Sequence, residues 1–451
     1  MTGPDTAAPP SGRTILRLAS SALIVLVAEP LYLMEDLAVV GRLGAVALAA
    51  LGVGSLVLGV VSTQLTFLSY GTTARSARMF GRGDRRAALA EGVAASWLAV
   101  GVGVVIAVLM TVIAPYVVGV IAPGDGVDDE SVGWLRIAVC GVPFILLSMA
   151  GNGWMRGVQD TRRPVVFVVI GLGLSAVLCP VLVHGLLGAP EMGLHGSAVA
   201  NVVGQSVAGV LFARQVVVAA CRSAPDEPWI ALLAPRRRVI GAQLSMARDL
   251  IVRSLSFQVC FLSAAAVAAR FGVASLAAHQ VVLQLWNFVS LVLDALAIAA
   301  QSLVGAALGA RAVGAAGVVA RRVTLVSVGV AVAVAAVFAV ARTPMGRIFT
   351  DDTGVLAALD TPWWFLIGML PVAGVVFALD GVLLGSGDAA YLRTTTVASA
   401  LIGFLPTIWL SLVFDWGLAG IWTGLALFMI CRLVALSARI AGGRWTLVEI
   451  R

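Results

Sequence analysis

The chain of 451 residues is 60% hydrophobic and 12% charged, and its formal net charge is +7. Soluble domains carry about 25% charged residues, so this composition excludes an ordinary soluble domain and favours a membrane protein. The basic residues are all arginines, and most of them fall in loops between apolar runs. Orientation in a membrane therefore explains the positive charge better than binding of nucleic acid does.

Apolar runs of roughly 20 residues or more recur from end to end without strict alternation, which favours helices over a membrane barrel. The first run is too long for the hydrophobic core of a signal peptide, so we expect it to be retained as the first helix. The sequence predicts twelve membrane-spanning helices, at 15–40, 46–73, 90–115, 132–155, 164–187, 193–220, 244–270, 275–305, 317–341, 361–385, 391–414 and 416–440.

The loops between these runs alternate in charge. Arginine gathers at 75–86, at 156–163 and around 236–238, whereas 123–130 and 350–354 are acidic. By the positive-inside rule both termini then lie in the cytoplasm. We therefore predict five parts: a disordered tail at 1–14, an N-lobe at 15–220, a cytoplasmic linker at 221–243, a C-lobe at 244–440 and a cytoplasmic tail at 441–451.

The two halves of the sequence repeat at a shift of 228 positions. Residues 42–50 (RLGAVALAA) then align with 270–278 (RFGVASLAA) without a gap. In the same register Gly153, Gly157 and Asp160 meet Gly381, Gly385 and Asp388. Each half holds six predicted spans, so the repeat keeps its orientation, as in transporters built from two lobes around a central cavity.

Several segments, in order, resemble the multidrug and toxic compound extrusion (MATE) transporters. They are 36–44 (DLAVVGRLG), 77–84 (ARMFGRGD) and 156–161 (RGVQDT), and the stretch from Arg248-Asp249 to Leu293-Asp294 most resembles the DinF-like branch. The resemblance implies an all-α membrane protein with twelve transmembrane helices in two pseudo-twofold-related six-helix lobes. It also implies a secondary active exporter of amphipathic, cationic small molecules, driven by inward proton movement and acting as a monomer in the cytoplasmic membrane.

Acidic residues in the first span suggest where a proton could bind. Glu29, Tyr32 and Asp36 share one helix face, while Glu35 points about a quarter-turn away. An ionised acid in a helix centre costs roughly 2.5–3.5 kcal/mol on insertion scales, so such a group is readily neutralised by a proton. Pairing with an arginine or a cap near the interface is the alternative. In the DinF-like branch the aspartate matching Asp36 is proposed to take up the coupling proton beside a tyrosine one turn earlier, here Tyr32.

The predicted N-lobe cavity departs from the family pattern. Ser175 and Cys179 stand where family members often have an asparagine and an aspartate, and Asn201 replaces a common threonine. The loss of a carboxylate disfavours a sodium site, because hard cations prefer several oxygen ligands. Asp36, helped by Glu29, is left as the main titratable group.

The second half has candidate polar and substrate-binding residues of its own: Asp294, Asp380, His279, Gln284, Trp286 and Asn287. Intramembrane acids are candidates for function, but pairing of Asp294 or Asp380 with Arg253 is an equal alternative. Asp249 could form an i,i+4 pair with Arg253. His279 could be a satisfied polar residue at a helix start, and Trp286 could either receive a cationic substrate or pack.

Other functions remain as alternatives. A sodium-coupled exporter of the same family and a flippase for lipid-linked sugars would share the two-lobe plan. The sequence lacks the HExxH motif of an intramembrane metalloprotease and the phosphate-binding loop of an ATP-driven pump. Five cysteines without close spacing argue against a disulfide framework or a zinc site. We expect no cofactor beyond an ion gradient and no metal.

Overall fold

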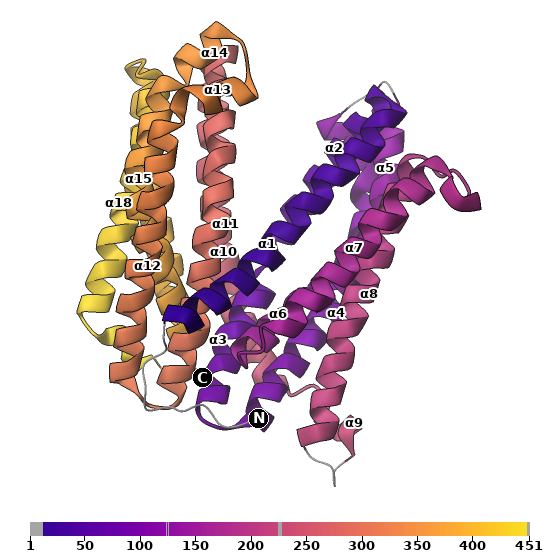
Figure 1. Ribbon diagram of the computed structural model, residues 1–451, viewed down its shortest axis with the longest axis vertical. Coiled ribbons are helices and arrows are strands. Elements are labelled where there is room, and N and C mark those ends of the chain that lie inside the picture. The colour runs from indigo at the N-terminus through magenta and orange to yellow at the C-terminus, as the bar shows by residue number, and fades with distance from the viewer. Residues whose placement is uncertain (1–11, 123, 125, 224–227, 449–451) are drawn as a thin grey trace. The chain divides into compact units, whose positions relative to one another are not determined.

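The computed structural model describes residues 12–122, 124, 126–223 and 228–448, and in that part of the chain every regular element is a helix (Figure 1). Most of the predicted N-terminal tail and the last three residues of the predicted C-terminal tail lie outside the described residues. The helices are α1 Gly12–Val40, α2 Ala45–Gln64, α3 Phe67–Gly81, α4 Arg85–Ile121, α5 Val127–Ala138, α6 Val142–Gly157, α7 Arg162–His184, α8 Leu194–Ser223, α9 Trp229–Leu232, α10 Arg237–Arg270, α11 Val273–Gly309, α12 Val313–Val340, α13 Arg342–Phe349, α14 Thr353–Ala358, α15 Asp360–Ser386, α16 Ala389–Ser399, α17 Leu405–Val413 and α18 Gly417–Ala441.

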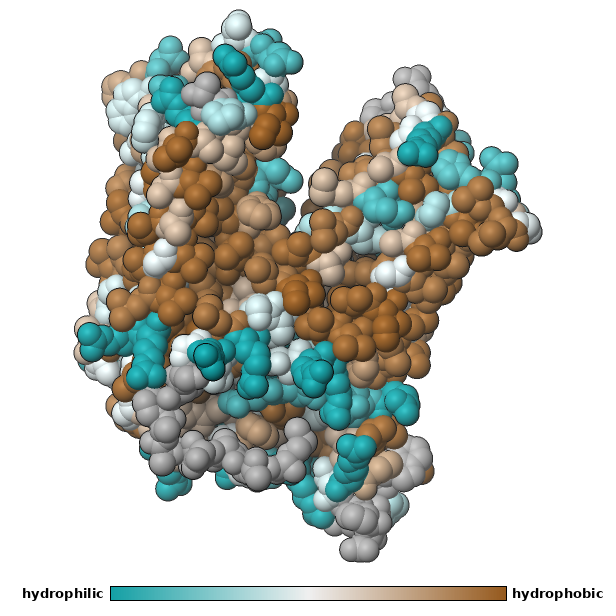
Figure 2. All heavy atoms as spheres, in the orientation of Figure 1, coloured by the Kyte–Doolittle hydropathy of each residue, from teal (hydrophilic) through white to brown (hydrophobic). Residues whose placement is uncertain are grey.

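Eleven helical segments of the described chain are long and apolar enough to cross a membrane. Some of these segments contain two consecutive helices, as Ala45–Gly81 contains α2 and α3. The 29 residues of α1 span about 43 Å at 1.5 Å per residue, more than the ~30 Å core of a bilayer. With α1 the number of spans is twelve, as predicted. Figure 2 shows apolar side chains covering the helix flanks, where lipid would lie, with hydrophilic ones toward the helix ends.

The described chain folds into two compact units. The N unit comprises Ile24–Ala247, and the C unit comprises the residues from Arg248 onward together with those up to Leu23. The dividing point therefore falls inside α10, which begins at Arg237, seven residues before the predicted span. The limits of the five parts derived from the sequence stay a prediction.

The start of α10 is held to the N unit by a buried polar network. The Arg75 guanidinium on α3 forms two 2.8 Å hydrogen bonds to the Glu91 carboxylate on α4. The Gln243 side-chain amide donates to the Glu91 backbone carbonyl and to its carboxylate, each at 2.9 Å. The sequence assigns Gln243 to the predicted linker because its side chain is polar. Its hydrogen bonds to Glu91 allow that side chain to be buried in a helix.

The repeat is visible inside each unit as the same close helix contact. A Cβ added to Gly153 of α6 would lie 2.5 Å from the Ser69 carbonyl oxygen of α3. A Cβ added to Gly381 of α15 would lie 2.2 Å from the Ala297 carbonyl oxygen of α11. Gly153 and Gly381 differ by 228 in number, and so do Ser69 and Ala297. The two units therefore have the same close backbone approach at equivalent places, and only glycine permits it.

Candidate functional site

Helix α1 carries three of the predicted site residues, of which Tyr32 and Asp36 are buried and Glu29 is exposed. Glu29, Tyr32 and Asp36 are spaced three and four apart, which places them on one helix face. Pro30 lies among them and has no backbone N–H, so the carbonyl of Leu26 lacks its helical donor. The sequence therefore weakens α1 where its acidic residues begin.

The Asp36 carboxylate is almost completely enclosed, with 2% of the residue exposed. The Cys179 thiol of α7 donates a hydrogen bond of 3.2 Å to its Oδ1 atom. Ser197 of α8 lies beside it as a further hydrogen-bonding group, and the Ser197 hydroxyl accepts a 3.2 Å hydrogen bond from the Trp134 indole. A carboxylate thus faces a weak sulfur donor and a hydroxyl, with the indole fixing the hydroxyl's position.

Tyr32 and Asn201 continue this polar surface toward the middle of the unit. Both are buried and lie against each other, yet the Tyr32 hydroxyl and the Asn201 carbonyl oxygen form no well-aligned hydrogen bond. With Asp36 they line a small cavity of about 50 Å³. A water needs roughly 10–15 Å³ of such space, so this cavity can admit water to unpaired polar atoms next to the carboxylate.

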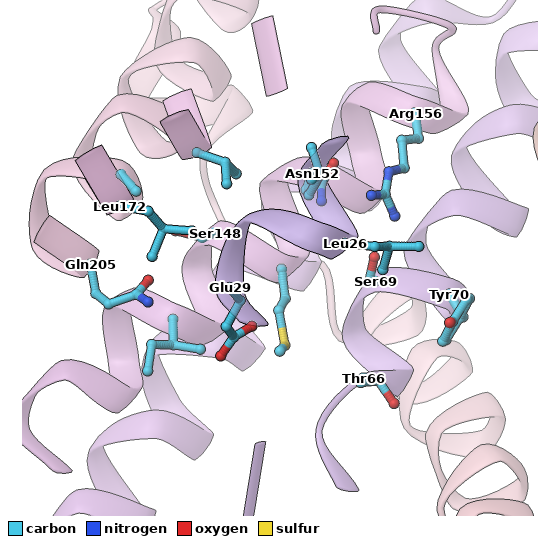
Figure 3. Close-up of a pocket in the computed structure, with 15 residues that line it drawn as sticks. Leu26, Glu29, Thr66, Ser69, Tyr70, Ser148, Asn152, Arg156, Leu172 and Gln205 are labelled. Atoms are coloured by element: carbon cyan, nitrogen blue, oxygen red, sulfur yellow. The ribbon is translucent and has the colours of Figure 1, made fainter. Parts of the chain in front are cut away.

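A larger cavity of about 160 Å³ lies next along α1, and Glu29 lines both cavities. Its wall combines the apolar Leu26 and Leu172 with the polar Asn152, Arg156 and other side chains (Figure 3). Figure 3 shows the Glu29 carboxylate and the Arg156 guanidinium at separate positions around the cavity, with Asn152 between them in this view. The cavity therefore offers a negative group, a positive group and apolar walls to a bound molecule.

Ser175, predicted for the N-lobe cavity, lies elsewhere. Its side chain is fully buried and its hydroxyl donates to the Ala200 carbonyl at 3.1 Å. A Cβ added to Gly204 would lie only 2.0 Å from this hydroxyl, so Ser175 fills the contact between α7 and α8. Of the residues predicted around Asp36, the structure brings Cys179 to the carboxylate and Tyr32 and Asn201 to the cavity beside it, and it leaves Ser175 in a helix interface.

Several residues in or beside the cavities were not predicted from the sequence. Ser197, Asn201 and Gln205 form a polar stripe on α8 at four-residue spacing, and Asn152 and Arg156 form another on α6. Only Asn201 of these was singled out. Polar residues four apart in an apolar span share a face, and this pattern could have identified the remaining four.

In the C unit, Asp380 of α15 is the centre of an ion cluster. Its Oδ2 atom accepts hydrogen bonds from Arg253 of α10, at 2.8 Å, and from Arg432 of α18. Both guanidinium groups also lie over the Phe257 ring, at 5.5 Å and 4.8 Å from its centroid. Asp294 interacts electrostatically with Arg432. The pairing of Asp380 with Arg253, one of the two alternatives from the sequence, is therefore present.

The alternative i,i+4 pair of Asp249 with Arg253 is wrong, because each residue has other partners. The Asp249 carboxylate binds Arg248 at 3.1 Å and Arg393 at 2.6 Å. Arg393 approaches from α16, so Asp249 ties α10 to another helix instead of bridging one turn of its own.

The remaining C-lobe candidates lie on different faces of α11. His279 is fully buried, with its ring edge toward Trp422 at 5.8 Å and neither nitrogen hydrogen-bonded. Trp286 is buried against Phe377, at 6.3 Å between ring centroids, as a packing residue would be. Gln284 and Asn287 are exposed. These residues therefore do not form one site. Among the described residues, no three His, Cys, Asp or Glu side chains gather closely enough to hold a metal ion.

Comparison with known proteins places these features in a family. The family model MatE matches residues 22–181 and 250–409, two segments related by the same shift of 228 positions. The chain is 31% identical to Protein DETOXIFICATION 44, chloroplastic, of Arabidopsis thaliana over 464 aligned residues, covering 99% of this chain and 85% of that protein. It is 29% identical to DNA damage-inducible protein F of Escherichia coli (strain K12), covering 95% and 92%.

A crystal structure of MATE in the bent conformation has the same fold. It superposes with a TM-score of 0.83 at 22% sequence identity, covering 96% of this chain and 94% of that one. The agreement extends over both units, so the resemblance found in short sequence segments holds for nearly the whole chain.

Proposed function

The chain belongs to the MatE family of multidrug efflux transporters, and we propose that it is a secondary active exporter that moves amphipathic, cationic compounds out of the cell in exchange for protons. The observation that carries this proposal is the enclosed carboxylate of Asp36 beside a cavity wide enough for part of a small molecule. One group can then respond to a proton while its neighbour holds a substrate.

Asp36 is the proposed coupling residue. Its charged form is partly compensated by the Cys179 thiol and Ser197, and its neutral form suits the apolar interior of the unit. The small cavity next to it supplies a place for water to deliver a proton. Proton uptake removes a negative charge from α1 and so favours a different arrangement of that helix. If the proton and the substrate each bind best to a different arrangement, binding of one releases the other, and the two are exchanged.

The surroundings of Asp36 support a proton over a sodium ion. Sodium, as a hard cation, binds best where several oxygen ligands converge. The Asp36 carboxylate instead accepts a hydrogen bond from the sulfur atom of Cys179, at the position where family members often carry an aspartate. A single carboxylate with a thiol suits proton binding better than it suits a cage of oxygens.

The cavity between Glu29 and Arg156 is the proposed substrate site. Its apolar wall would bury the hydrophobic part of a drug, and Glu29 would pair with a cationic group. The polar Asn152 and Gln205 can adapt their hydrogen bonds to different ligands. We place the protein in the cytoplasmic membrane, with both termini and the arginine-rich loops on the cytoplasmic side.

Dye export from everted membrane vesicles tests the proposal. A pH gradient alone should drive transport by the native protein, whereas a sodium gradient alone should not. Asp36→Asn should reach the membrane and lose gradient-driven export, because the amide cannot exchange a proton, and Asp36→Glu should retain part of it. Normal export by Asp36→Asn under a pH gradient, or export that depends only on sodium, would contradict the proposed coupling.

A further inference from the structure

A polar pocket lies between two spans of the C unit. Helices α13 and α14 connect α12, which ends at Val340, to α15, which begins at Asp360, so they lie at a boundary between membrane and water. Figure 2 shows hydrophilic side chains gathered at this end of the unit above an apolar flank. The pocket has a volume of about 240 Å³ and is lined by Arg342, Gly346, Arg347, Leu356, Leu359, Asp360 and Trp363.

This pocket carries one net positive charge, because two guanidinium groups face one carboxylate. Arg342 binds Asp360 with an N–O distance of 2.7 Å. Arg347 is exposed and forms no ion pair with any described residue. A guanidinium without an acidic partner at the membrane surface can bind the phosphate of a headgroup through two parallel hydrogen bonds.

An apolar groove of about 350 Å³ lies between α15 and α18 of the same unit. Its α15 side runs from Trp364 to Val372, about 12 Å along the helix axis. A Cβ added to Gly368 in this wall would meet no atom within 4 Å, so the groove is open at that position. The lining residues are all apolar: Trp364, Phe365, Gly368, Met369, Val372, Ala426, Met429 and Ile430.

The pocket and the groove have adjacent lining residues near the start of α15. Trp363 lines the pocket and its neighbour Trp364 lines the groove. The Arg342 guanidinium lies over the Trp364 ring, 5.7 Å from its centroid. Tryptophan is enriched at this depth of a membrane because its ring suits the boundary between headgroups and acyl chains.

We propose that the pocket and groove together bind one anionic phospholipid. Its phosphodiester headgroup contacts Arg347 and Arg342, and one acyl chain lies along the groove between α15 and α18. The positive pocket complements the phosphate, and the groove continues in the direction that an acyl chain takes into the bilayer. A free phosphate would use the pocket alone, and a fatty acid or detergent tail would use the groove alone. The site is separate from the N-unit cavity, so the inference does not depend on the proposed transport.

Native mass spectrometry of the purified full chain in detergent tests both halves of this site. The protein is titrated with phosphatidylglycerol or with phosphatidylcholine of the same acyl chains. The first phosphatidylglycerol adduct should form about tenfold more tightly. Arg347→Gln should remove most of that preference. The control Arg270→Gln, an exposed arginine at the end of α10 in the same unit, should keep it.

The groove is tested by Gly368→Leu, which should weaken binding of both lipids by about fivefold or more because it fills the path of the chain. Gly329→Leu is the control, since Gly329 of α12 also has nothing within 4 Å of an added Cβ and lies outside the groove. Equal affinity for the two lipids, or equal losses in Arg347→Gln and Arg270→Gln, would overturn the proposal. So would competition by inorganic phosphate combined with no effect of Gly368→Leu, because that result indicates a free-anion pocket.

Discussion

At the scale of single residues, Asp36 is a buried acid whose negative charge is only partly stabilised by hydrogen bonds. An acid within a span costs roughly 2.5–3.5 kcal/mol on insertion scales, and a hydrogen bond to a charged group returns about 1.5–3 kcal/mol. The thiol of Cys179 is a weak donor, so it returns less than a hydroxyl or amide would. The two protonation states of Asp36 then lie within a few kcal/mol of each other, which is what a residue that must load and release a proton requires.

The position of Glu29 leads to a prediction about substrate charge. Glu29→Gln removes the carboxylate shared by both N-unit cavities while keeping the shape of the side chain. Binding of a permanently cationic dye should weaken about tenfold, corresponding to about 1.4 kcal/mol, and binding of an uncharged compound of similar size should change little. Equilibrium binding to purified protein measures both.

Glu35→Gln is the matched control for this change. Glu35 lies on the same helix but lines neither of the two cavities. Dye affinity should therefore stay close to that of the native protein. An equal loss in Glu29→Gln and Glu35→Gln would indicate that general negative charge on α1, instead of a specific contact, attracts the dye.

Part of this site could be predicted from the sequence, for a physical reason. Asp36 and Tyr32 stand out because charged and polar groups are costly in an apolar helix. The contact of Asp36 with Cys179 depends on how α1 meets α7, 143 residues later, and helix periodicity contains no information on that distance. Ser175 illustrates the same limit, because only the packing of α7 on α8 decides that it points away from the cavity.

At the scale of helices, the start of α10 depends on the buried network of Arg75, Glu91 and Gln243. Breaking a buried ion pair by removing one partner typically costs 3–5 kcal/mol, because the other charge stays buried without compensation. We therefore expect Glu91→Gln to destabilise the protein by about 3–5 kcal/mol. Unfolding in detergent micelles, followed by tryptophan fluorescence, measures the change.

The exposed pair of Arg163 and Asp160 provides the comparison. Arg163→Gln breaks a 3.0 Å ion pair whose arginine side chain is 44% exposed. Such surface pairs contribute about 0–1 kcal/mol, so this variant should unfold almost as the native protein does. Similar losses for the two variants would mean that the Arg75–Glu91 pair is no more important than a surface contact.

The repeated glycines give a second prediction at this scale. Gly153→Ala and Gly381→Ala place a methyl group 2.5 Å and 2.2 Å from a neighbouring carbonyl oxygen, so α6 and α15 must shift. Each should lower stability by about 1–3 kcal/mol. Gly329→Ala, in an open part of α12, should instead raise stability by about 0.5–1 kcal/mol, because alanine favours a helix. Thermal unfolding of the three variants side by side would test this; a stabilising Gly381→Ala would contradict the close approach.

The spans themselves could be predicted because hydropathy is a property of each segment alone. The early start of α10 and the short helices α13 and α14 could not, because polar residues there resemble a loop until their partners are known. Gln243 is an example: an amide with two hydrogen bonds to Glu91 is stable in a helix, and the same amide without them is typical of a linker.

At the scale of the whole molecule, the two repeated halves have different side chains at equivalent positions, which form a cavity in one unit and an ion cluster in the other. The shift of 228 positions that relates the two halves also relates the two segments matched by the family model. Four residues that line the larger N-unit cavity correspond in this register to four residues of the C-unit ion cluster. The pairs are Val25 with Arg253, Glu29 with Phe257, Thr66 with Asp294, and Asn152 with Asp380. The duplication could be recognised from glycines and loops, whereas the exchange of a cavity for an ion cluster depends on side chains that diverged.

Membrane orientation is the prediction that belongs to the whole chain. One span, α4, separates Arg82 from Asp128, and three spans separate Arg237 from Asp351. Because both numbers are odd, Arg82 must lie on the opposite side of the membrane from Asp128. Arg237 must likewise lie on the opposite side from Asp351. The arginine-rich loops should be cytoplasmic, because positively charged loops are retained on that side.

Labelling of single cysteines in intact cells decides this orientation. In a background without the five native cysteines, a membrane-impermeant maleimide should modify Asp128→Cys and Asp351→Cys. It should modify Arg82→Cys and Arg237→Cys only after the membrane is opened. Dye export by the cysteine-free protein is the control for native folding, since Cys179 contacts Asp36. Labelling of Arg82→Cys in intact cells, with protection of Asp128→Cys, would reverse the orientation. It would also place the Asp36 end of α1 toward the cytoplasm, where an inward proton gradient could not load it from outside.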